Sequence, residues 1–545
     1  MFPTTLVLLL FILPQGPFAE ACPTSCNCFR IYKVFCSDEK MVDVPKEIKP
    51  KFTEIVFVET SIRTLKTGSF RNNTGLTKII FLNNNIVSLE PGTFIGLSDL
   101  TELEITGNPL LSTLNAGIFD DLTHLNKLII AHNAIQNLSK ELFNNTEDLE
   151  VLKLQGNKID NISNGTFDQL KHLNTLSLGL NQITMLPEGL FSNLNNLKIL
   201  YLNENRISSL PPGVFNNLTE LTDLALEGNL IEHLPPGIFS HLTHLQKLRL
   251  QDNSIMDLPT SVFSSLLNLA FLNLDNNKLD TLPNDLFHST PNLFKLSLKW
   301  NRLKTLPEGI FSGLFKVKTI VLSHNQITSL PKRTFMELMT LTKLHLENNS
   351  LARMDRELFE NLTNLEFINL SDNQLQMLPE GIFDSNYKLV LVPLYNNPWN
   401  CDCQLTYIMQ WLHEITDLTQ NSQMRCESPT HLKGKPILLL GTEKLECSLP
   451  ENAADISFSL RRVQVTNRFL NSPNLSNTSS ISCTYSSLDG ATFLSCNIPT
   501  CRSVKVRFLA QDESETQGLK YSSANDLILN SDCAVTSVNI TINLT

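Results

Sequence analysis

The sequence predicts an α/β solenoid, a stack of short coils whose strands form one parallel β-sheet on the concave face of a horseshoe. Two observations predict this fold. The segments LKILYLNENRISSLPPGVFNNLTE and LTDLALEGNLIEHLPPGIFSHLTH are consecutive, at residues 197–220 and 221–244, and are nearly identical. The same spacing recurs through most of the chain. Self-similarity at a period of about 24 residues is typical of repeat architectures, in which each unit packs on its neighbours.

An asparagine motif, L-x-x-L-x-L-x-x-N, sets the period. Every interval between motif asparagines is the same except the one from Asn108 to Asn133, which is one residue longer. An earlier copy has Thr60 in the asparagine position, which brings the array to about fifteen coils. This motif is the signature of leucine-rich repeats. Its asparagines are Asn84, Asn108, Asn133, Asn157, Asn181, Asn205, Asn229, Asn253, Asn277, Asn301, Asn325, Asn349, Asn373 and Asn397.

Each recurring position of the coil has a physical reason. The alternating leucines turn one face of a short strand inward. The asparagine amide carries both donors and an acceptor, so it can pair buried backbone groups of its own and the neighbouring coil. A phenylalanine follows about ten residues later, from Phe70 to Phe383, and should stack as an apolar spine. Proline six residues after the asparagine stiffens many return limbs, at Pro187, Pro211, Pro235, Pro259, Pro283, Pro307, Pro331 and Pro379.

The two ends of the array differ from the repeats. An apolar run followed by Ala19 and Ala21 predicts a secretory signal peptide at residues 1–21. We then expect an N-terminal cap at 22–51, the array at 52–397, a C-terminal cap at 398–447 and a small β-rich tail at 448–545. No later segment has the length of a membrane span. The sequence therefore predicts a secreted, extracellular protein without a membrane anchor.

Twelve cysteines support export, because disulfides persist in oxidising compartments. They fall in three groups of four, and none lies inside the array. Zinc binding is the competing interpretation of such clusters, but their even number and their place beside the array favour disulfides. Each group alone permits three pairings. The groups are Cys22, Cys26, Cys28 and Cys36; Cys401, Cys403, Cys426 and Cys447; and Cys483, Cys496, Cys501 and Cys533.

Thirteen N-x-S/T sequons predict N-glycosylation of an exported chain. In two coils Ser139 and Ser163 occupy the position where other coils have proline, so these coils lack the stiffening proline and have a sequon instead. We expect that flank to carry glycans. The sequon asparagines are Asn72, Asn137, Asn144, Asn161, Asn164, Asn217, Asn348, Asn361, Asn369, Asn474, Asn477, Asn539 and Asn543.

The search for catalytic chemistry gives no persuasive constellation. Zinc-peptidase, nucleophile-elbow and P-loop motifs are absent, so we expect no catalytic residue, metal or cofactor. His241 and His244 are interpreted as solvated surface. Carboxylates on neighbouring coils, Glu204, Asp223 and Glu227, are interpreted as charges on an exposed strand face. The formal charge of −11 is not arranged in blocks, which disfavours nucleic acid as a partner.

The concave face is where partner contacts are expected by default. Aromatic side chains beside arginine are typical of interaction hot spots, although variable positions can also bring aromatics together by chance. Asn369 lies in the same strand-centre column, so a glycan there would cover the C-terminal part of the concavity. The candidate contact residues are Tyr201, Arg249, Phe271, Phe294, Lys299 and Trp300.

Five segments carry a more specific resemblance. The N-terminal CPTSCNCFRIYKVFCSDE leads into EIVFVETSI, and the array ends with LPEGIFDSNYKL and NNPWNCDCQLTYIMQWL before a later CTYSSLDGATFLSC. Together they resemble the large, non-catalytic regulatory subunits of plasma carboxypeptidase N, along essentially the whole mature chain. The first-repeat FVET and the cysteine-bearing tail are the specific parts, because many extracellular proteins share the repeats and caps.

The resemblance implies a glycosylated plasma protein that binds and stabilises a catalytic zinc carboxypeptidase subunit in a hetero-oligomer such as a heterotetramer. That catalytic chain would remove C-terminal Arg or Lys from kinins and anaphylatoxins. It also implies the cap disulfides Cys22–Cys28, Cys26–Cys36, Cys401–Cys426 and Cys403–Cys447, and no pairing for the last four cysteines.

Two other functions remain open. An extracellular repeat protein could instead sequester a toxin, a phospholipase or a microbial ligand. An enzyme is the third class, which a peptidase assay of the isolated chain with and without chelator would test.

Overall fold

The computed structural model describes residues 22–29, 32–46, 48–414, 420–440 and 445, and the backbone of six strands between residues 463 and 543. The chain divides into two compact units, residues 1–447 and 448–545. The predicted signal peptide lies outside the described residues, as do Cys447, Asn474, Asn477 and the side chains of the last four cysteines.

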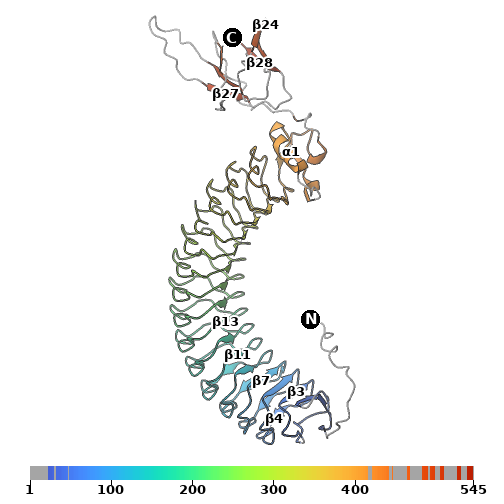
Figure 1. Ribbon diagram of the computed structural model, residues 1–545, viewed down its shortest axis with the longest axis vertical. Coiled ribbons are helices and arrows are strands. Elements are labelled where there is room, and N and C mark those ends of the chain that lie inside the picture. The colour runs from blue at the N-terminus through green and yellow to red at the C-terminus, as the bar shows by residue number, and fades with distance from the viewer. Residues whose placement is uncertain are drawn as a thin grey trace. The chain divides into compact units, whose positions relative to one another are not determined.

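One sheet runs through the first unit, and its strands follow the chain order along the inner side of a curved array (Figure 1). Each strand pairs in parallel with its equivalent one coil later, as where Leu224 lies opposite Leu248. These motif leucines are fully buried. The predicted solenoid with a parallel sheet is confirmed. The strands of the array are β3 (Glu54–Val58), β5 (Lys78–Leu82), β7 (Glu102–Thr106), β9 (Lys127–Ile129), β11 (Val151–Lys153), β12 (Thr175–Ser177), β13 (Ile199–Tyr201), β14 (Asp223–Ala225), β15 (Lys247–Arg249), β16 (Phe271–Asn273), β17 (Lys295–Ser297), β18 (Thr319–Val321), β19 (Lys343–His345) and β20 (Phe367–Asn369).

The last coil of the array does not form a strand. It joins the sheet through a single bridge, in which Leu391 lies opposite Phe367. Pro393 occupies the position that Asn369 has in the preceding strand. Because proline has no N–H to donate, the last coil contributes one hydrogen bond fewer to the sheet, although the carbonyl of Pro393 still accepts the N–H of Leu370 at 3.0 Å.

Proline also explains a difference between the first and the later return limbs. In the early coils the limb forms short parallel strands, and the N–H of Glu90 donates to the carbonyl of Leu65 at 2.9 Å. Most later coils have proline at this position and lack that donor, the exception being the coil with Asp355. The short strands are β4 (Thr64–Leu65), β6 (Ser88–Leu89), β8 (Thr113–Leu114) and β10 (Asn137–Leu138).

The convex side of each described coil consists of hydrogen-bonded turns rather than helices. A typical pair links the N–H of Leu218 to the carbonyl of Phe215 and the N–H of Leu221 to that of Leu218, each at 3.0 Å. The phenylalanines stack beneath these turns with ring centroids 5.9 to 6.5 Å apart. The α/β solenoid therefore has its helical residues in the C-terminal cap, and aromatic stacking holds the convex side together.

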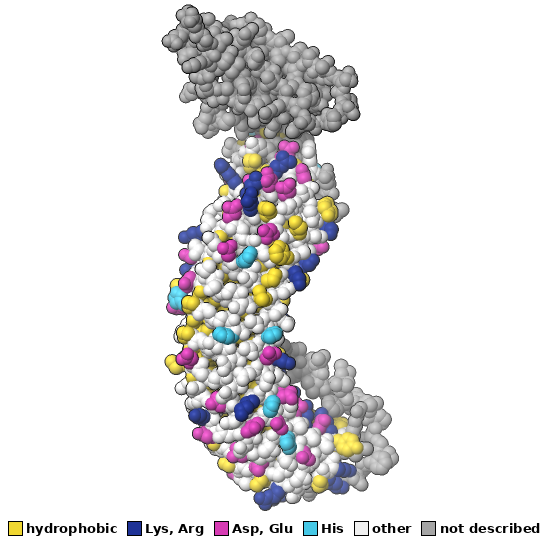
Figure 2. Space-filling view, turned by 60° about the vertical axis from the view of Figure 1, so that its left-hand side comes forward, with side chains coloured by type: hydrophobic (Ala, Val, Ile, Leu, Met, Phe, Trp, Pro, Cys, Tyr) yellow, Lys and Arg dark blue, Asp and Glu magenta, His cyan; other side chains and the backbone are white. Residues whose placement is uncertain are grey.

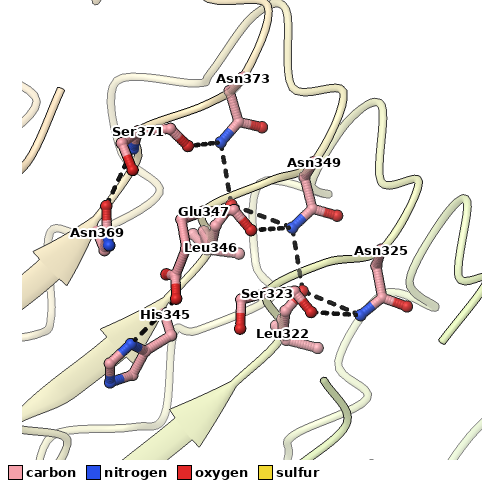
Figure 3. Close-up of polar contacts among 10 residues, drawn as sticks. All are labelled: Leu322, Ser323, Asn325, His345, Leu346, Glu347, Asn349, Asn369, Ser371 and Asn373. Carbon is pink, nitrogen blue, oxygen red and sulfur yellow. Dashed lines mark hydrogen bonds and ion pairs between the residues drawn. The ribbon is translucent and has the colours of Figure 1, made fainter. Parts of the chain in front are cut away.

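The motif asparagines form a ladder of hydrogen bonds between coils, part of which is drawn in Figure 3 with Asn325, Asn349 and Asn373. Asn253 donates from Nδ2 to the carbonyls of Leu226 in the preceding coil at 2.9 Å and Leu250 in its own coil at 3.1 Å. Its Oδ1 accepts the N–H of Ile231 in the preceding coil at 3.1 Å. Each buried amide thus pairs backbone groups of two coils that water cannot reach.

The ladder is interrupted at Asn108, the last motif asparagine before the one interval that has an extra residue. The Nδ2 and Oδ1 atoms of Asn108 are buried without a hydrogen-bond partner among the described residues. The next rung, Asn133, accepts the main-chain N–H of Asn108 instead at 2.8 Å. Asn133 also donates from Nδ2 to the carbonyl of Ile105 at 2.9 Å, so the link between these two coils is kept while the amide of Asn108 stays unpaired.

A disulfide-bonded hairpin caps the N-terminal end. Strands β1 (Cys26–Phe29) and β2 (Lys33–Cys36) are antiparallel, and β2 pairs with β3 of the first coil. Disulfides join Cys22 to Cys28 and Cys26 to Cys36. The hairpin therefore covers the apolar end of the stack.

A helical segment caps the other end. Helix α1 (Thr406–Glu414) buries Ile408 and Leu412, and the ring of Trp411 lies 4.8 Å from that of Phe383, the last ring of the spine. A disulfide joins Cys401 to Cys426, and Cys403 is also disulfide-bonded. Disulfide-bonded caps are confirmed at both ends. The other elements of this cap are β21 (Trp399–Asn400), η3 (Cys403–Leu405), η4 (Gln420–Gln423), β22 (Cys426–Ser428) and η5 (Ile437–Leu439).

The second unit contains two antiparallel sheets, with strand orders β23-β26-β27 and β24-β25-β28. The register of β24 and β25 places Cys483 directly opposite Cys496. The strands are β23 (Val463–Thr466), β24 (Ser482–Leu488), β25 (Ala491–Asn497), β26 (Val504–Phe508), β27 (Asn525–Leu529) and β28 (Ser537–Asn543).

Replacing Asn253 by alanine should destabilise the array by about 3 kcal/mol, because buried backbone groups of two coils lose their partner. Asn108→Ala is the matched control and should cost much less, since that amide has no partner to lose. Urea denaturation of both variants measures the difference. Equal losses would show that the ladder hydrogen bonds do not govern stability.

Candidate functional site on the concave face

A polar cluster lies at the middle of the concave face, on strands β13 to β15. Asp223 on β14 accepts hydrogen bonds from Arg249 on β15, with Nη1–Oδ1 and Nη2–Oδ2 distances of 2.8 and 3.4 Å. The guanidinium carbon lies 5.9 Å from the ring centroid of Tyr201 on β13. Ala225 lies between Tyr201 and Arg249 in the register of the sheet. Its small side chain leaves room for Arg249 to extend toward Tyr201.

Burial affects the ion pairing and the pKa values of the ionisable side chains in this cluster. Asp223 is buried and its charge is balanced by Arg249. Glu227 follows on the same coil, and its Oε2 is buried without a hydrogen-bond partner among the described residues. Burial raises the pKa of Glu227, and burial followed by the nearby charge of Asp223 raises the pKa of Tyr201. The cluster therefore presents an aromatic ring and a paired, oriented arginine, with a carboxyl group beside them that has one buried oxygen without a hydrogen-bond partner among the described residues.

Two further groups of predicted contact residues lie in later coils. Trp300 is 54% exposed, stacks on His324 with centroids 3.8 Å apart, and has Nζ of Lys299 5.9 Å from its ring. Phe271 on β16 is half-buried, with Nζ of Lys295 5.6 Å from its ring. Each aromatic ring thus carries a cation at its face.

The six candidate residues do not form one cluster. The structure brings Tyr201 together with Arg249, and Lys299 with Trp300, whereas Phe271 contacts Lys295 rather than another candidate. Phe294 lies one position before strand β17 and is 54% exposed. Sequence reasoning missed Lys295 and His324, because a cation or ring one coil away is recognised only once the register is known.

A histidine–carboxylate pair occurs near the C-terminal end of the concave face, but its geometry does not resemble a catalytic site. Nδ1 of His345 lies 3.5 Å from Oε1 of Glu347 (Figure 3). Ser323 in the preceding coil is fully buried, so its hydroxyl is closed to a substrate. The described ranges contain no group of three or more His, Cys, Asp or Glu side chains that could hold a metal ion.

A polar hollow of about 1130 Å³ lies beside the early strands, where charged side chains from neighbouring coils meet. Several of its charges are paired: Glu102 accepts from Lys127 at 2.7 Å and from Lys78 at 2.8 Å. His124 pairs with Asp148 at 3.1 Å. The hollow is thus lined by charged groups of both signs.

The histidines of the H-x-x-H segment are on the surface. His241 and His244 are exposed, and each Nδ1 lies 3.0 Å from a local oxygen, of Ser240 and Thr219 respectively. Among the described helices, none combines the length and apolar character that crossing a membrane requires.

The described sequon asparagines are exposed except Asn369, which is half-buried and accepts the N–H of Ser371 at 3.1 Å. Asn369 lies directly opposite His345 in the register. A glycan at this position would therefore occupy the concavity beside His345. The exposed ones are Asn72, Asn137, Asn144, Asn161, Asn164, Asn217, Asn348 and Asn361.

Glu227→Gln should stabilise the protein at neutral pH by a small amount, under about 1 kcal/mol after solvent screening. With a raised pKa, the folded state keeps this proton to higher pH than the unfolded chain, so ionisation above the ordinary value of 4.5 lowers stability. Thermal melting from pH 3.5 to 8 should show the gain at neutral pH and lose it at the acid end.

Glu102→Gln is the control, and it should lower the stability of the fold at neutral pH rather than raise it. Burial alone would raise the pKa of Glu102, but the hydrogen bonds and charges of Lys127 and Lys78 outweigh it and lower the pKa. This carboxylate stabilises the fold above 4.5, and the stabilisation is lost as pH falls through the lowered pKa. A Glu102→Gln variant that melts like the wild type at pH 7 would contradict this assignment.

Comparison with known proteins agrees with the repeat architecture. The family described as leucine rich repeat matches residues 50–110, 109–159, 123–183, 147–205, 171–231, 195–255, 243–303, 291–351 and 339–398. A leucine-rich repeat protein of Leptospira interrogans superposes with a TM-score of 0.60 at 27% identity, over 70% of this chain and 93% of that one. The Drosophila Toll–Spätzle complex structure gives 0.56 at 21% identity, over 77% and 65%, which is a likeness of fold alone.

Two curated relatives share part of the sequence. Human carboxypeptidase N subunit 2 is 40% identical over 160 residues, which are 29% of each chain. The mouse protein of that name is 40% identical over 169 residues, again 29% of each. The match thus spans less than a third of these relatives, and the resemblance expected along the whole mature chain is shown over 29% of it. The matches to the repeat family cover well over half of the sequence, and the chain belongs to the leucine-rich repeat family.

Proposed function

We propose that the chain is a secreted, non-catalytic binding subunit that holds and stabilises a catalytic zinc carboxypeptidase chain acting on C-terminal Arg or Lys of peptides such as kinins and anaphylatoxins. The observation that carries this proposal is the 40% identity to carboxypeptidase N subunit 2 in two mammals. The disulfide-bonded caps and exposed sequons support an extracellular location.

The surface supports binding rather than catalysis. Tyr201, Arg249 and Trp300 belong to the residue types that dominate interaction hot spots, and each is held by a neighbouring coil. Rings and guanidinium groups that are already oriented lose little entropy when a partner binds. An extended, rigid concave sheet lined by such groups suits a protein partner.

Capture of the tagged, secreted chain from homologous plasma tests the proposal. Carboxypeptidase activity on an Arg- or Lys-ended peptide should co-purify, be lost on addition of a chelator, and survive heating longer when the chain is present. If no peptidase is captured, the partner assignment is wrong, and a captured toxin, phospholipase or microbial product would support a sequestering function. Peptidase activity in the isolated chain would contradict the non-catalytic role.

Arg249→Ala should weaken capture of the carboxypeptidase about tenfold or more, because Tyr201 loses its cation and Asp223 keeps only the more distant Lys247, at 3.9 Å, as a charge partner. Arg302→Ala is the control, since Arg302 is exposed and lies after the motif asparagine, off the strands. Surface plasmon resonance with the catalytic chain measures both. Equal affinities would remove the mid-concave cluster from the interface.

A further inference from the structure

A column of exposed apolar side chains lies on the flank that leads into the strands of the later coils. It consists of Leu267, Phe294, Phe315 and Met339, here named the flank strip. These side chains are 54%, 54%, 60% and 61% exposed. They come from four consecutive coils. Leu267, Phe315 and Met339 lie ten residues before the motif asparagine of their coil, and Phe294 lies seven residues before Asn301. Large exposed apolar side chains in a contiguous row mark an interaction surface more often than scattered ones do.

The earlier coils show that this is not a property of the repeat itself. In six consecutive coils before the strip, the same position is polar, so neither the core nor the turn needs an apolar residue there. The polar residues are Thr123, Glu147, Lys171, Asn195, Thr219 and Thr243.

The backbone of the flank strip is fixed by a second ladder of hydrogen bonds. Nδ2 of Asn292 donates to the carbonyl of Leu267 at 2.8 Å. In the same way Oγ1 of Thr340 donates to the carbonyl of Phe315 at 2.9 Å, and Nδ2 of Asn364 donates to the carbonyl of Met339 at 2.7 Å. The strip is therefore a rigid surface, whose docking costs little backbone entropy.

The segments that carry the strip are basic although the chain as a whole is acidic. The nearby carboxylate of Glu337 already accepts hydrogen bonds from Ser312 and Gly313. The four segments from ten to four residues before Asn277, Asn301, Asn325 and Asn349 contain no Asp or Glu. They contain four lysines. The equivalent segments of the earlier coils include Glu147, Asp148, Glu150, Glu220 and Asp223. The lysines of the strip are Lys295, Lys316, Lys318 and Lys343.

The pattern of sequons agrees with a protein partner at this place. No sequon occurs between Asn217 and Asn348, and the whole flank strip falls within this interval. A glycan is bulky and solvated, so its absence leaves the surface open to another protein. Figure 2 shows hydrophobic side chains over the middle and upper coils, while charged side chains lie along the whole length of the array.

We propose that the flank strip is a second contact surface for the partner chain, which presents an apolar centre bordered by acidic residues. This inference rests on the proposed function, and it extends the interface from the concave sheet onto the flank. Leu267, Phe294, Phe315 and Met339 supply the apolar contact. The lysines around them steer an acidic surface into place and fix its orientation.

Surface plasmon resonance of the full-length secreted chain with purified carboxypeptidase catalytic chain tests the proposal. The double variant Phe315→Asp with Met339→Asp should bind about 100-fold more weakly or worse, because two apolar contacts become charges that repel the acidic border. The matched control, Lys171→Asp with Asn195→Asp, changes the same position in earlier coils and should stay within about threefold of the wild type.

A second variant separates charge from packing. Lys316→Glu with Lys318→Glu should lower the association rate and flatten its dependence on salt. All these positions lie at the surface, so melting temperatures should stay close to that of the wild type and exclude unfolding as the cause.

The outcomes distinguish this inference from the proposed function. If the wild type binds the catalytic chain and both flank variants bind equally well, the flank inference is overturned and the proposed function stands. If the wild type does not bind, both are overturned. Light scattering adds a third outcome: a wild-type dimer that the flank variants convert to monomer would assign the strip to a second copy of this chain and contradict the proposal.

Discussion

The buried asparagine amide is the interaction on which the rest of the structure depends. One side chain pairs carbonyl groups of its own coil and the preceding coil, and accepts an N–H of the preceding coil. Because these groups lie where water cannot reach them, a coil can stack only at the height and rotation that satisfies them. The leucines and the phenylalanine spine contribute apolar burial, but hydrophobic contact is not directional and would not fix this register by itself.

Because the register is fixed, residues at equivalent positions of successive coils form columns on the surface. Side chains at equivalent positions of successive coils become neighbours, so Asp223 and Lys247 lie side by side although their coils are separate in sequence. The contact of Arg249 with Tyr201 needs one more condition, a small residue at Ala225 between them. The same stacking lines up the polar and then apolar residues of the flank, which gives the array two surfaces, a concave sheet and a flank strip, on one rigid body.

Much of the fold could be predicted from the sequence, because the motif positions indicate which side chains are buried and which form hydrogen bonds between coils. The coil period, the parallel sheet and the disulfide-bonded caps follow from the spacing of Asn, Leu and Cys. Two departures were not predicted. Asn108 stands at the motif position, yet its side-chain amide has no hydrogen-bond partner among the described residues. The last coil joins the sheet through a single bridge at Leu391 and forms no strand.

The candidate site was harder to predict than the fold. Tyr201, Arg249 and Trp300 were recognised from residue type, but which of them meet depends on side-chain reach and on the sizes of intervening residues. His324 joins Trp300 only because both lie in the turn one coil apart. The flank strip was missed because its residues stand outside the strand motif, where the sequence pattern places no expectation on polarity.

Hydrogen–deuterium exchange of the full-length chain, with and without the catalytic carboxypeptidase chain, tests the central claim that a partner binds the middle and later coils. Exchange should be slowed in peptides covering residues 199–251 and 264–345, and unchanged in the coils before Asn157. Amides of the buried ladder should be protected in both samples. Protection confined to the early coils, or no change anywhere, would show that the partner does not bind these coils.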